Sequence, residues 1–358
     1  MEAKIAILAG DGIGPEVMEQ AIRVLDAVAS KFSHNFSYTE GLVGGAAWDS
    51  HQSHFPEETK EICLKSDAIL FGSVGGPMDE RHLDKWKGCE ANSILALRKT
   101  FSFNANFRPA KIYKELIDKC PLRADIVENG ADLLVVRELL GDIYFGEHSR
   151  REENGETIAK DVAEYSVSQI KSVAHSAFQA AQKRRKKLTS VDKANVLETS
   201  RLWREVVEEV HKEYSDVSLE HMFVDNAAMQ IVLDPAQFDV ILTGNIFGDI
   251  LSDTAAVLPG SLGLTPSASL NKDGFAMYEP SGGSAPDIAG KGVANPIAQI
   301  LSAAMMLKFS FSLIEESEAI EAAVDQVLSK GLRTGDIHSE PNKLVGTSEF
   351  TNAVIAEI

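Results

Sequence analysis

Cysteine is scarce in this sequence, and long apolar runs are missing. The three cysteines among 358 residues, Cys63, Cys89 and Cys120, are widely spaced and form no C-x-x-C pair. This pattern excludes a disulfide framework and a cysteine-based zinc site, so we expect free thiols in a cytoplasmic protein. No apolar run approaches the roughly 20 residues that span a bilayer, and the N-terminus lacks the basic and apolar regions of a signal peptide. We therefore expect neither membrane insertion nor secretion.

Basic residues are also too few to balance the acidic ones. The sequence has 35 Lys and Arg against 53 Asp and Glu, a formal net charge of −18. This balance opposes nucleic-acid binding, because phosphate backbones attract basic surfaces. The basic run at residues 183–187 could be read as an RNA-binding patch or a localisation signal, but it closes an expected helix, where cations complement the negative end of the dipole. An anionic substrate must therefore be held by a local cluster of arginines.

Apolar, β-rich runs alternate with amphipathic stretches along most of the chain, which predicts an α/β fold. The length suggests two domains or one large α/β unit. Pro15 suits the first position of a helix that follows the glycine-rich segment GDGIGP. The strand-like runs are residues 4–9, 68–72, 133–136, 188–192, 221–225 and 239–244.

Glycine-rich segments at residues 10–15, 72–77 and 279–296 follow or flank these runs and are candidate ligand loops. In the first, Pro15 stands where the dinucleotide pattern G-x-G-x-x-G requires glycine, so an ordinary Rossmann site is not supported. A tight strand-to-helix turn explains that segment at least as well as direct ligand contact. In the polar segment 147–165, Asn154-Gly155 predicts a β-hairpin that could protrude as an arm for subunit contacts.

Three carboxylates are candidate metal ligands. Asp249 and Asp253 are four residues apart and share a face if their segment is helical, and Asp225 ends the strand-like run 221–225. Converging carboxylates repel one another unless a divalent cation lies among them, and hard oxygen ligands suit Mg²⁺ or Mn²⁺. Each Asp taken alone is better explained as a helix cap or a solvated acid, but together they favour a metal site.

Arginines and two proton-transfer residues complete the candidate site. Arg137 follows a strand too apolar to be exposed, so its guanidinium needs an anionic partner. With Arg98 and Arg108 it could hold a dicarboxylate by bidentate hydrogen bonds, although Arg98 alone could be a solvated helix residue. Lys193 lies at the end of another strand, where a nearby cation would disfavour its charged form and suit it to proton transfer. Tyr144 could donate a proton to a carbanion.

These segments together resemble the isocitrate/isopropylmalate dehydrogenase family of β-decarboxylating dehydrogenases over essentially the whole chain. The motifs in family order are GDGIGPE, GSVGGP, LRK, NANFRPA, RELLGDIYFGE, RRKKLTSVDKANVLETSRLWREV, VDNAAMQ, NIFGDILSD, GSAPDIAGKGVANP and GLRTGD.

The resemblance implies a two-domain α/β fold with a central mixed sheet, not a Rossmann fold. Residues 1–103 and 261–358 would form a cofactor-binding domain, and residues 104–260 a substrate and dimerisation domain with an arm at about 147–165. It also implies a homodimer with shared active sites, in which Lys193 and Asp225 enter the site from the partner subunit.

The implied reaction is NAD-dependent oxidative decarboxylation of (2R,3S)-3-isopropylmalate to 4-methyl-2-oxopentanoate and CO₂, a step of leucine biosynthesis. Lys193 would accept the hydroxyl proton, Tyr144 would protonate the enolate, and Mg²⁺ or Mn²⁺ would act as a Lewis acid. Asp287 favours NAD, because a carboxylate bonds the ribose 2′-hydroxyl and repels a 2′-phosphate. The implied cofactor-binding residues are Gly75, Gly76, Glu279, Gly283, Ser284, Ala285, Pro286, Asp287, Ile288 and Asn295.

Substrate choice depends on the residues before Arg98. Ile94 and Leu95 offer an apolar wall to an isopropyl group, whereas the polar Asn92 and Ser93 leave isocitrate, homoisocitrate or tartrate as alternative substrates. A non-catalytic regulatory paralogue is the alternative from another class, and retention of every proposed catalytic residue opposes it. The sequence departs from the family pattern at four positions, Ala91, Leu140, Asp142 and Gly282.

Overall fold

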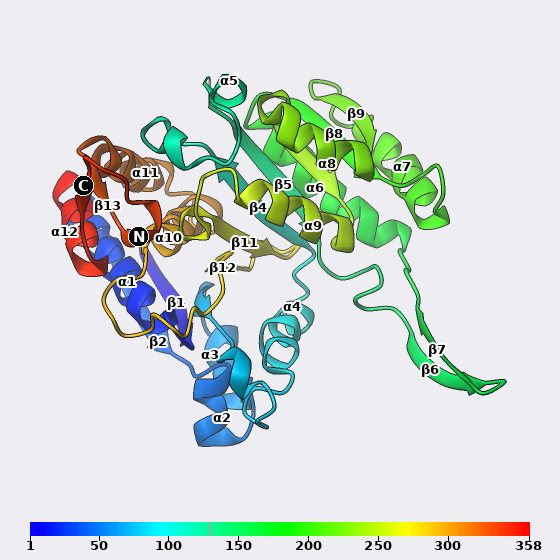
Figure 1. Ribbon diagram of the computed structural model, residues 1–358, viewed down its shortest axis with the longest axis horizontal. Coiled ribbons are helices and arrows are strands. Elements are labelled where there is room, and N and C mark those ends of the chain that lie inside the picture. Colours follow the sequence, from blue (N-terminus) through cyan, green and yellow to red (C-terminus); the bar gives the residue numbers. More distant parts are fainter. Residues whose placement is uncertain (129) are drawn as a thin grey trace. The chain divides into compact units, whose positions relative to one another are not determined.

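The computed structural model describes residues 1–128 and 130–358. The chain divides into two compact units (Figure 1). The first contains Met1–Phe101, Tyr113–Lys119 and Pro259–Ile358, and the second contains Ser102–Ile112 and Cys120–Leu258. The first unit is therefore assembled from segments that lie far apart in the sequence.

The first unit contains a mixed sheet with the strand order β2-β1-β3-β12-β11. Strands β2, β1, β3 and β12 are parallel to one another, and β11 is antiparallel to β12. Consecutive residues of β1 and β3 are buried, as expected for parallel strands covered on both faces. The strands are β1 (Glu2–Gly10), β2 (Asn35–Glu40), β3 (Ala68–Ser73), β11 (Pro266–Leu270), β12 (Ala276–Pro280) and the short pair β13 (Leu332–Arg333) and β14 (Lys343–Leu344).

The helices of the first unit bury apolar stripes against this sheet and against one another. Helix α1 has Pro15 in its first turn, as predicted, and buries Val17, Val24 and Val28 on one face. The α-helices are α1 (Gly14–Phe32), α2 (Gly45–His51), α3 (Glu57–Leu64), α4 (Ala96–Thr100), α10 (Ile297–Phe309), α11 (Ile314–Ser329) and α12 (Thr347–Glu357). The other helices are the π-helix η2 (Ala91–Leu95) and the 3₁₀-helices η1 (Met78–Glu80), η3 (Lys114–Lys119), η5 (Leu262–Leu264) and η6 (Gly335–Ile337).

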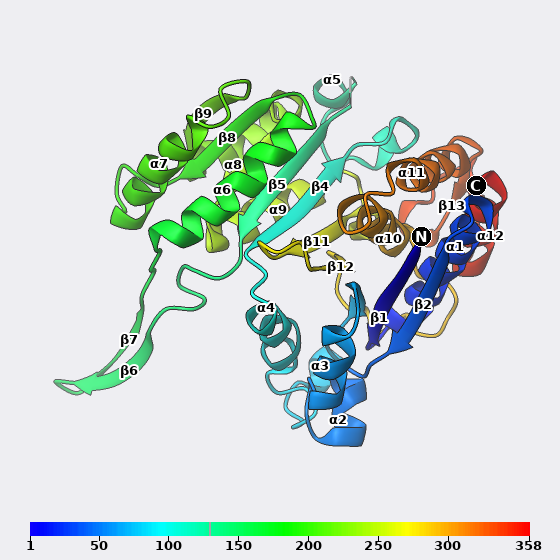
Figure 2. The same cartoon turned by 180° about the vertical axis from the view of Figure 1, so that it is seen from behind.

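The second unit contains strands in the order β4-β5-β10-β8-β9. Strands β5, β10, β8 and β9 are parallel, and β4 is antiparallel to β5. Helix α6 covers one face of this sheet, while α8 and α9 lie on the other, as the front and back views show (Figure 1 and Figure 2). The strands are β4 (Ala105–Lys111), β5 (Asp132–Glu138), β8 (Lys187–Asp192), β9 (Ser218–Phe223) and β10 (Val240–Thr243). The helices are α5 (Ala124–Val127), α6 (Val167–Gln182), α7 (Glu198–His211), α8 (Val224–Leu233), η4 (Pro235–Gln237) and α9 (Asn245–Ala256).

The polar segment between β5 and α6 forms the hairpin that Asn154-Gly155 predicts. Strands β6 (His148–Glu153) and β7 (Glu156–Asp161) pair antiparallel, and both turn residues have positive φ, 52° and 80°. Nearly all of the hairpin residues are exposed.

The predicted α/β class with a mixed sheet is confirmed, with one local correction. The strand predicted at 221–225 ends at Phe223, and Asp225 lies in the first turn of α8. Phe223 has extended backbone angles and precedes the helix directly, so the apolar run continues into α8 without a loop. An acidic residue in a first turn is stabilised by the positive end of the helix dipole.

Candidate active site

Four parallel strands of the second unit end at a common edge of its sheet. Carboxyl ends of parallel strands are where open α/β sheets bind ligands. Arg137 is the penultimate residue of β5, and Lys193 directly follows β8. Helix α8 begins directly after β9, and α9 begins shortly after β10. The predicted catalytic and metal-binding residues of this unit therefore lie along one edge.

The buried guanidinium of Arg137 is held by side chains of α9. The register between β5 and β10 pairs Arg137 with Thr243, two residues before Asn245. Nε and Nη2 of Arg137 donate to Oδ1 of Asn245 at 3.1 and 2.8 Å, and Nη1 donates to Oδ1 of Asp249. Arg137 is 2% exposed, so these partners offset a large desolvation cost. The expectation that this arginine needs an anionic partner is met by Asp249.

Tyr144 joins the same carboxylate from the loop after β5. Its hydroxyl donates to Oδ2 of Asp249 at 2.8 Å, and Cζ of Arg137 lies 5.6 Å from the centre of its ring. Partial burial raises the pKa of the Tyr144 hydroxyl, and the hydrogen bond and negative charge of Asp249 raise it further. Tyr144 is therefore kept protonated, which is the state that a proton donor needs.

Arg108 reaches the next turn of α9 from strand β4. Its Nη1 donates to Oδ1 of Asp253 at 2.9 Å and to the hydroxyl of Ser252 at 3.0 Å. Its Nε donates to Oδ1 of Asn106 at 2.7 Å, a residue on the same face of the strand. The second unit thus brings together five predicted site residues, Arg108, Arg137, Tyr144, Asp249 and Asp253.

Lys193 and Asp225 form a separate pair at the ends of β8 and β9. The register places Asp192 opposite Phe223, so the residues that follow each strand are neighbours. Nζ of Lys193 lies 2.8 Å from Oδ1 of Asp225. The hydrogen bond from Lys193 lowers the pKa of Asp225.

The three predicted metal ligands do not converge within one chain. Among residues 1–128 and 130–358, no group of three or more His, Cys, Asp or Glu side chains is arranged to hold a metal ion. Asp249 and Asp253 lie one turn apart on α9, and both are accessible to solvent. Asp249 and Asp253 therefore lie on one helix, and Asp225 lies on another, α8.

Arg98 lies in the first unit, where it is buried beside Glu279. Its Nη2 lies 3.3 Å from Oε1 of Glu279 on β12. Ile94 and Leu95 end the π-helix η2, immediately before α4, and both are half-buried. Ser93 is fully buried in that π-helix, and its hydroxyl donates to the carbonyl of Cys89.

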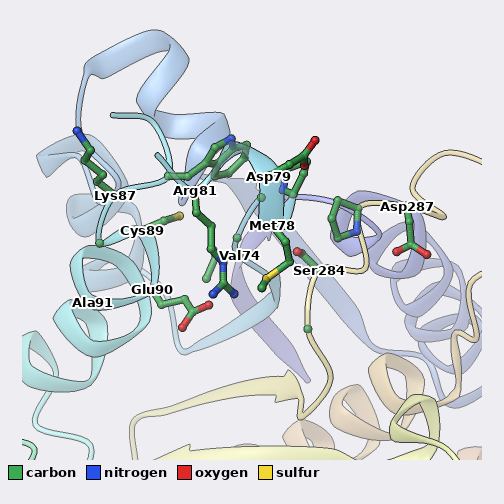
Figure 3. A pocket seen from close by; sticks show the side chains of 17 residues that line it. Val74, Met78, Asp79, Arg81, Lys87, Cys89, Glu90, Ala91, Ser284 and Asp287 are labelled. Carbon is green, nitrogen blue, oxygen red and sulfur yellow. The ribbon is translucent and has the colours of Figure 1, made fainter. Parts of the chain in front are cut away.

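Two cavities of the first unit are lined by predicted cofactor-binding residues. The larger, of about 1040 Å³, is lined by Gly75, Gly76, Gly283, Ser284, Pro286 and Asp287 together with residues 77–79, 81 and 86–91. Figure 3 shows the side chains of Arg81 and Glu90 pointing toward each other, with Asp287 on the opposite side of the cavity. The smaller, of about 500 Å³, is lined by Gly283, Ala285, Ile288 and Asn295, with Gly282, Val293 and Asp336 among its other residues.

The first glycine-rich segment packs against the segment that contains Ser284. Gly10 and Gly12 have positive φ, 73° and 60°, which makes a tight turn between β1 and α1. The backbone N–H of Ile13 donates to the carbonyl of Ser284 at 2.8 Å, and a Cβ on Gly12 would overlap that carbonyl. The sequence left open a tight strand-to-helix turn or direct ligand contact for residues 10–15, and the structure shows the tight turn.

Several polar partners in the site were missed by the sequence analysis. Asn245 precedes Asp249 by four residues, and Asn106 precedes Arg108 by two. These spacings place each pair on one face of a helix or a strand, so periodicity could have found both asparagines. Nothing in the sequence indicated that Glu279 would pair with Arg98.

The basic run is neutralised by acidic residues. Nε of Arg184 and the backbone N–H of Arg185 each donate to the buried carboxylate of Asp239 at 2.8 Å. Arg184 also lies 2.9 Å from Asp132. The run follows α6 and ends on the first residue of β8, and these ion pairs leave less positive charge available for an RNA than the sequence suggests. No helix in the described part of the chain combines the length and the hydropathy of a membrane span.

The fold and the site define a class of enzyme. The chain carries arginines that can bind carboxylates, a protonated phenol, a lysine at a strand end and two carboxylates suited to a divalent cation. These are the groups of an oxidatively decarboxylating dehydrogenase. The chain belongs to the isocitrate/isopropylmalate dehydrogenase family, whose model matches residues 4–354. The resemblance inferred from the motifs is therefore confirmed.

Relatives match over the full length. The chain is 56% identical to 3-isopropylmalate dehydrogenase from Desulfotalea psychrophila, with 99% of each chain covered. It is 52% identical to 3-isopropylmalate dehydrogenase from Clostridium acetobutylicum, with 100% of this chain and 99% of the relative covered. Among solved structures, isocitrate dehydrogenase from Methylococcus capsulatus is similar, with a TM-score of 0.86, 32% identity and 99% of each chain covered.

Proposed function

We propose that this protein oxidatively decarboxylates (2R,3S)-3-isopropylmalate to 4-methyl-2-oxopentanoate and CO₂ with NAD, a step in leucine biosynthesis. The observation that carries the proposal is the cluster of Arg137, Tyr144 and Asp249 at the strand ends of the second unit. Relatives that bear the name 3-isopropylmalate dehydrogenase and are 50–56% identical over nearly the whole chain support the same reaction.

The arginines provide the substrate-binding groups. Arg98, Arg108 and Arg137 can each donate two parallel hydrogen bonds to a carboxylate, which suits the two carboxylates of isopropylmalate. Without substrate, Asp249 and Asp253 accept hydrogen bonds from Arg137 and Arg108. A dicarboxylate would replace the Asp oxygens on the guanidinium groups, and those oxygens would then be available to a cation.

The residues before Arg98 favour isopropylmalate over isocitrate. The buried hydroxyl of Ser93 is engaged by the carbonyl of Cys89, so it cannot meet a third substrate carboxylate. Ile94 and Leu95 are half-buried and offer apolar surface to an isopropyl group. Isocitrate, homoisocitrate and tartrate remain the alternative substrates to be tested.

Lys193 and Tyr144 are assigned the two proton transfers. The Lys193 ammonium pairs with Asp225 in this chain; a cation bound by Asp225 would disfavour that charge, and the neutral amine would then accept the proton of the substrate hydroxyl. Tyr144 donates a proton to the enolate carbon after CO₂ leaves, and its raised pKa keeps the hydroxyl protonated until then. Arg137 holds the remaining carboxylate in place during both transfers.

The carboxylates on α9 fit a divalent cation. Asp249 and Asp253 are hard oxygen ligands on one face of the helix, which suits Mg²⁺ or Mn²⁺, and we assign Asp225 as the third ligand. A cation held by these carboxylates would supply Lewis-acid polarisation of the 2-oxo group. Because Asp225 does not converge with Asp249 and Asp253 among the described residues, we assign Asp225 and its partner Lys193 to the site of a partner subunit, as the family resemblance implies.

The cavities of the first unit fit NAD. The 500 Å³ cavity has apolar walls that include Ile288 and Val293, which suits an adenine ring. Asp287 lines the 1040 Å³ cavity, where its carboxylate would bond a ribose 2′-hydroxyl and repel a 2′-phosphate. NAD bound there would supply the hydride acceptor for the oxidation. We therefore assign to NAD binding the nine predicted residues that line these cavities, and we add Glu279, which lines neither cavity, on the family resemblance alone.

Homodimer formation is supported by an apolar surface on the second unit. Helices α8 and α9 pack against each other and expose Met229, Val232, Leu233 and Ile250, and Val257 directly after α9 is exposed as well. An exposed patch of this kind usually marks a protein–protein interface. The exposed β6–β7 hairpin would add a second contact. Light scattering tests the assembly, and a monomer with full turnover would contradict shared sites.

The test of function is NADH formation with Mg²⁺ and either isopropylmalate or isocitrate, repeated with NADP. Turnover with NAD and isopropylmalate alone supports the proposal. Turnover only with isocitrate would reject the apolar wall, and inactivity with both would favour the non-catalytic paralogue.

The free, buried thiols Cys63, Cys89 and Cys120 suit a reducing cytoplasm, where we place the reaction.

A further inference from the structure

The first turn of α9 is held by side chains from two other segments. The backbone N–H of Asn245 donates to the hydroxyl oxygen of Tyr165 at 2.7 Å, and that of Ile246 donates to Oδ2 of Asp142 at 3.0 Å. The N-cap residue Gly244 has no side chain to do this. Two of the N–H groups that every helix leaves unpaired at its start are therefore paired from outside. We call Asp142 and Tyr165 the α9 clamp.

The hydroxyl of Tyr165 can reach the start of α9 because Gly141 and Gly244 have no side chains that would collide with its ring. A Cβ on Gly141 would overlap Cε1 of the ring, and a Cβ on Gly244 would lie 3.0 Å from its hydroxyl oxygen. The ring of Trp203 meets Tyr165 edge-on, with the ring centres 5.4 Å apart. The ring is thus fixed on several sides, so the position of its hydroxyl is determined by packing.

Asp142 adopts a backbone conformation that a non-glycine residue rarely takes, with φ of 71°. Its side chain compensates, because Oδ1 accepts from the N–H of Ile143 at 2.9 Å while Oδ2 accepts from the N–H of Ile246. Its own N–H donates to the carbonyl of Glu164, the residue before Tyr165. Asp142 thereby joins three segments: the loop that carries Tyr144, the start of α9 and the end of the hairpin.

The helix that the clamp holds carries the partners of Arg137. Asn245, the first residue of α9, accepts two hydrogen bonds from the guanidinium, and Asp249, one turn later, accepts one more and binds the Tyr144 hydroxyl. A shift of the first turn of α9 would move both of these acceptors together. The clamp touches neither the substrate nor the cofactor residues assigned above.

We propose that Asp142 and Tyr165 are positioning residues that hold α9 so that Arg137 and Tyr144 face the substrate correctly, an inference that rests on the proposed function. Loss of one clamp hydrogen bond leaves an N–H at the start of α9 without its partner. We expect such a loss to weaken binding of isopropylmalate by about tenfold. Because the clamp lies in the second unit, its loss should raise KM for isopropylmalate and leave KM for NAD unchanged.

The test compares Tyr165→Phe and Asp142→Gly with wild type in steady-state kinetics. Both variants should raise KM for isopropylmalate about tenfold and leave KM for NAD unchanged. Asp142→Asn should have a KM for isopropylmalate close to that of wild type, because its amide oxygen can still accept the hydrogen bond from Ile246. Tyr214→Phe is the matched control, since Tyr214 is also buried in this unit and loses only a 2.9 Å contact with His175.

Hydrogen exchange provides a measurement that does not depend on activity. Amides in the first turn of α9 should exchange faster in Tyr165→Phe than in Tyr214→Phe. Unchanged exchange, an unchanged KM for isopropylmalate, or an equal rise of both KM values would overturn the proposal. If wild type is inactive on isopropylmalate, the proposed function fails by itself, and the exchange measurement still decides whether the clamp holds α9.

Discussion

Replacing Glu138 by Gln is expected to change how stability depends on pH. Glu138 is fully buried at the end of β5, where its carboxylate accepts from the backbone N–H groups of Leu140 and Gly141 at 2.7 and 2.8 Å. Burial raises the pKa of this carboxyl from 4.5 to about 7, against the opposing effect of these two hydrogen bonds and of Tyr165, and the charge of Asp142 adds to the rise. Between pH 4.5 and 7 the folded protein holds a proton that the unfolded chain has released.

The stabilising effect of that proton is fully present below pH 4.5 and is lost as the pH rises through 7. A pKa difference of this size corresponds to roughly 3 kcal/mol. With an unfolding entropy of roughly 2.1 cal/mol/K per residue over 358 residues, the loss equals about 4 °C in Tm. Glu138→Gln lacks the titrating group and does not undergo this loss.

Scanning calorimetry of both proteins at pH 5 and pH 8 measures the effect. The Tm of Glu138→Gln relative to wild type should be about 3 °C higher at pH 8 than at pH 5, because part of the loss already occurs between pH 4.5 and pH 5. Glu205 on α7 is exposed and offers a control, because Glu205→Gln should show the same difference from wild type at both pH values. A Tm difference for Glu138→Gln that does not change with pH would refute the reasoning.

Three further predictions concern the metal, the cofactor and the thiols. Asp249→Asn should lower Mg²⁺-dependent turnover about a hundredfold, because a carboxylate ligand is lost, and full activity would remove Asp249 from the site. Gly282→His should tighten NAD binding in calorimetry, since a Cβ there meets nothing nearer than Leu262 at 3.7 Å and the position lines the 500 Å³ cavity; unchanged affinity would contradict this. Cys63 and Cys89 should label slowly with a thiol reagent at pH 8 in the native protein and rapidly in urea, because burial raises their pKa to about 12 and 11.

Much of the fold could be predicted from the sequence because its strands are buried on both faces. The runs at 68–72 and 239–244 are continuous apolar segments bounded by glycine or charge, which is typical of parallel strands. The predicted strand at 221–225 is two residues too long at its end. An apolar residue such as Val224 fits the pattern of a buried strand and of a helix equally well. Periodicity over five residues cannot distinguish the two.

The candidate site was predictable in its residue types but not in its pairings. A buried arginine near the end of an apolar strand requires an anion, and Arg137 has one. Whether that anion is a substrate or a neighbouring carboxylate depends on the register between β5 and β10, and the local sequence of Arg137 does not contain that information. The same holds for Arg98 and Glu279, which are 181 positions apart.

The arrangement of the first unit has a consequence for the order of folding during synthesis. Residues 1–101 emerge early from the ribosome, but the strands β11 and β12 that complete their sheet belong to the segment that begins at Pro259. The second unit is complete by Leu258 and can fold while that later segment is still being made. The N-terminal strands must therefore wait with an unpaired edge on β3 for more than half of the synthesis time. During this interval the nascent chain is most exposed to aggregation, and a chaperone would be of most use to it.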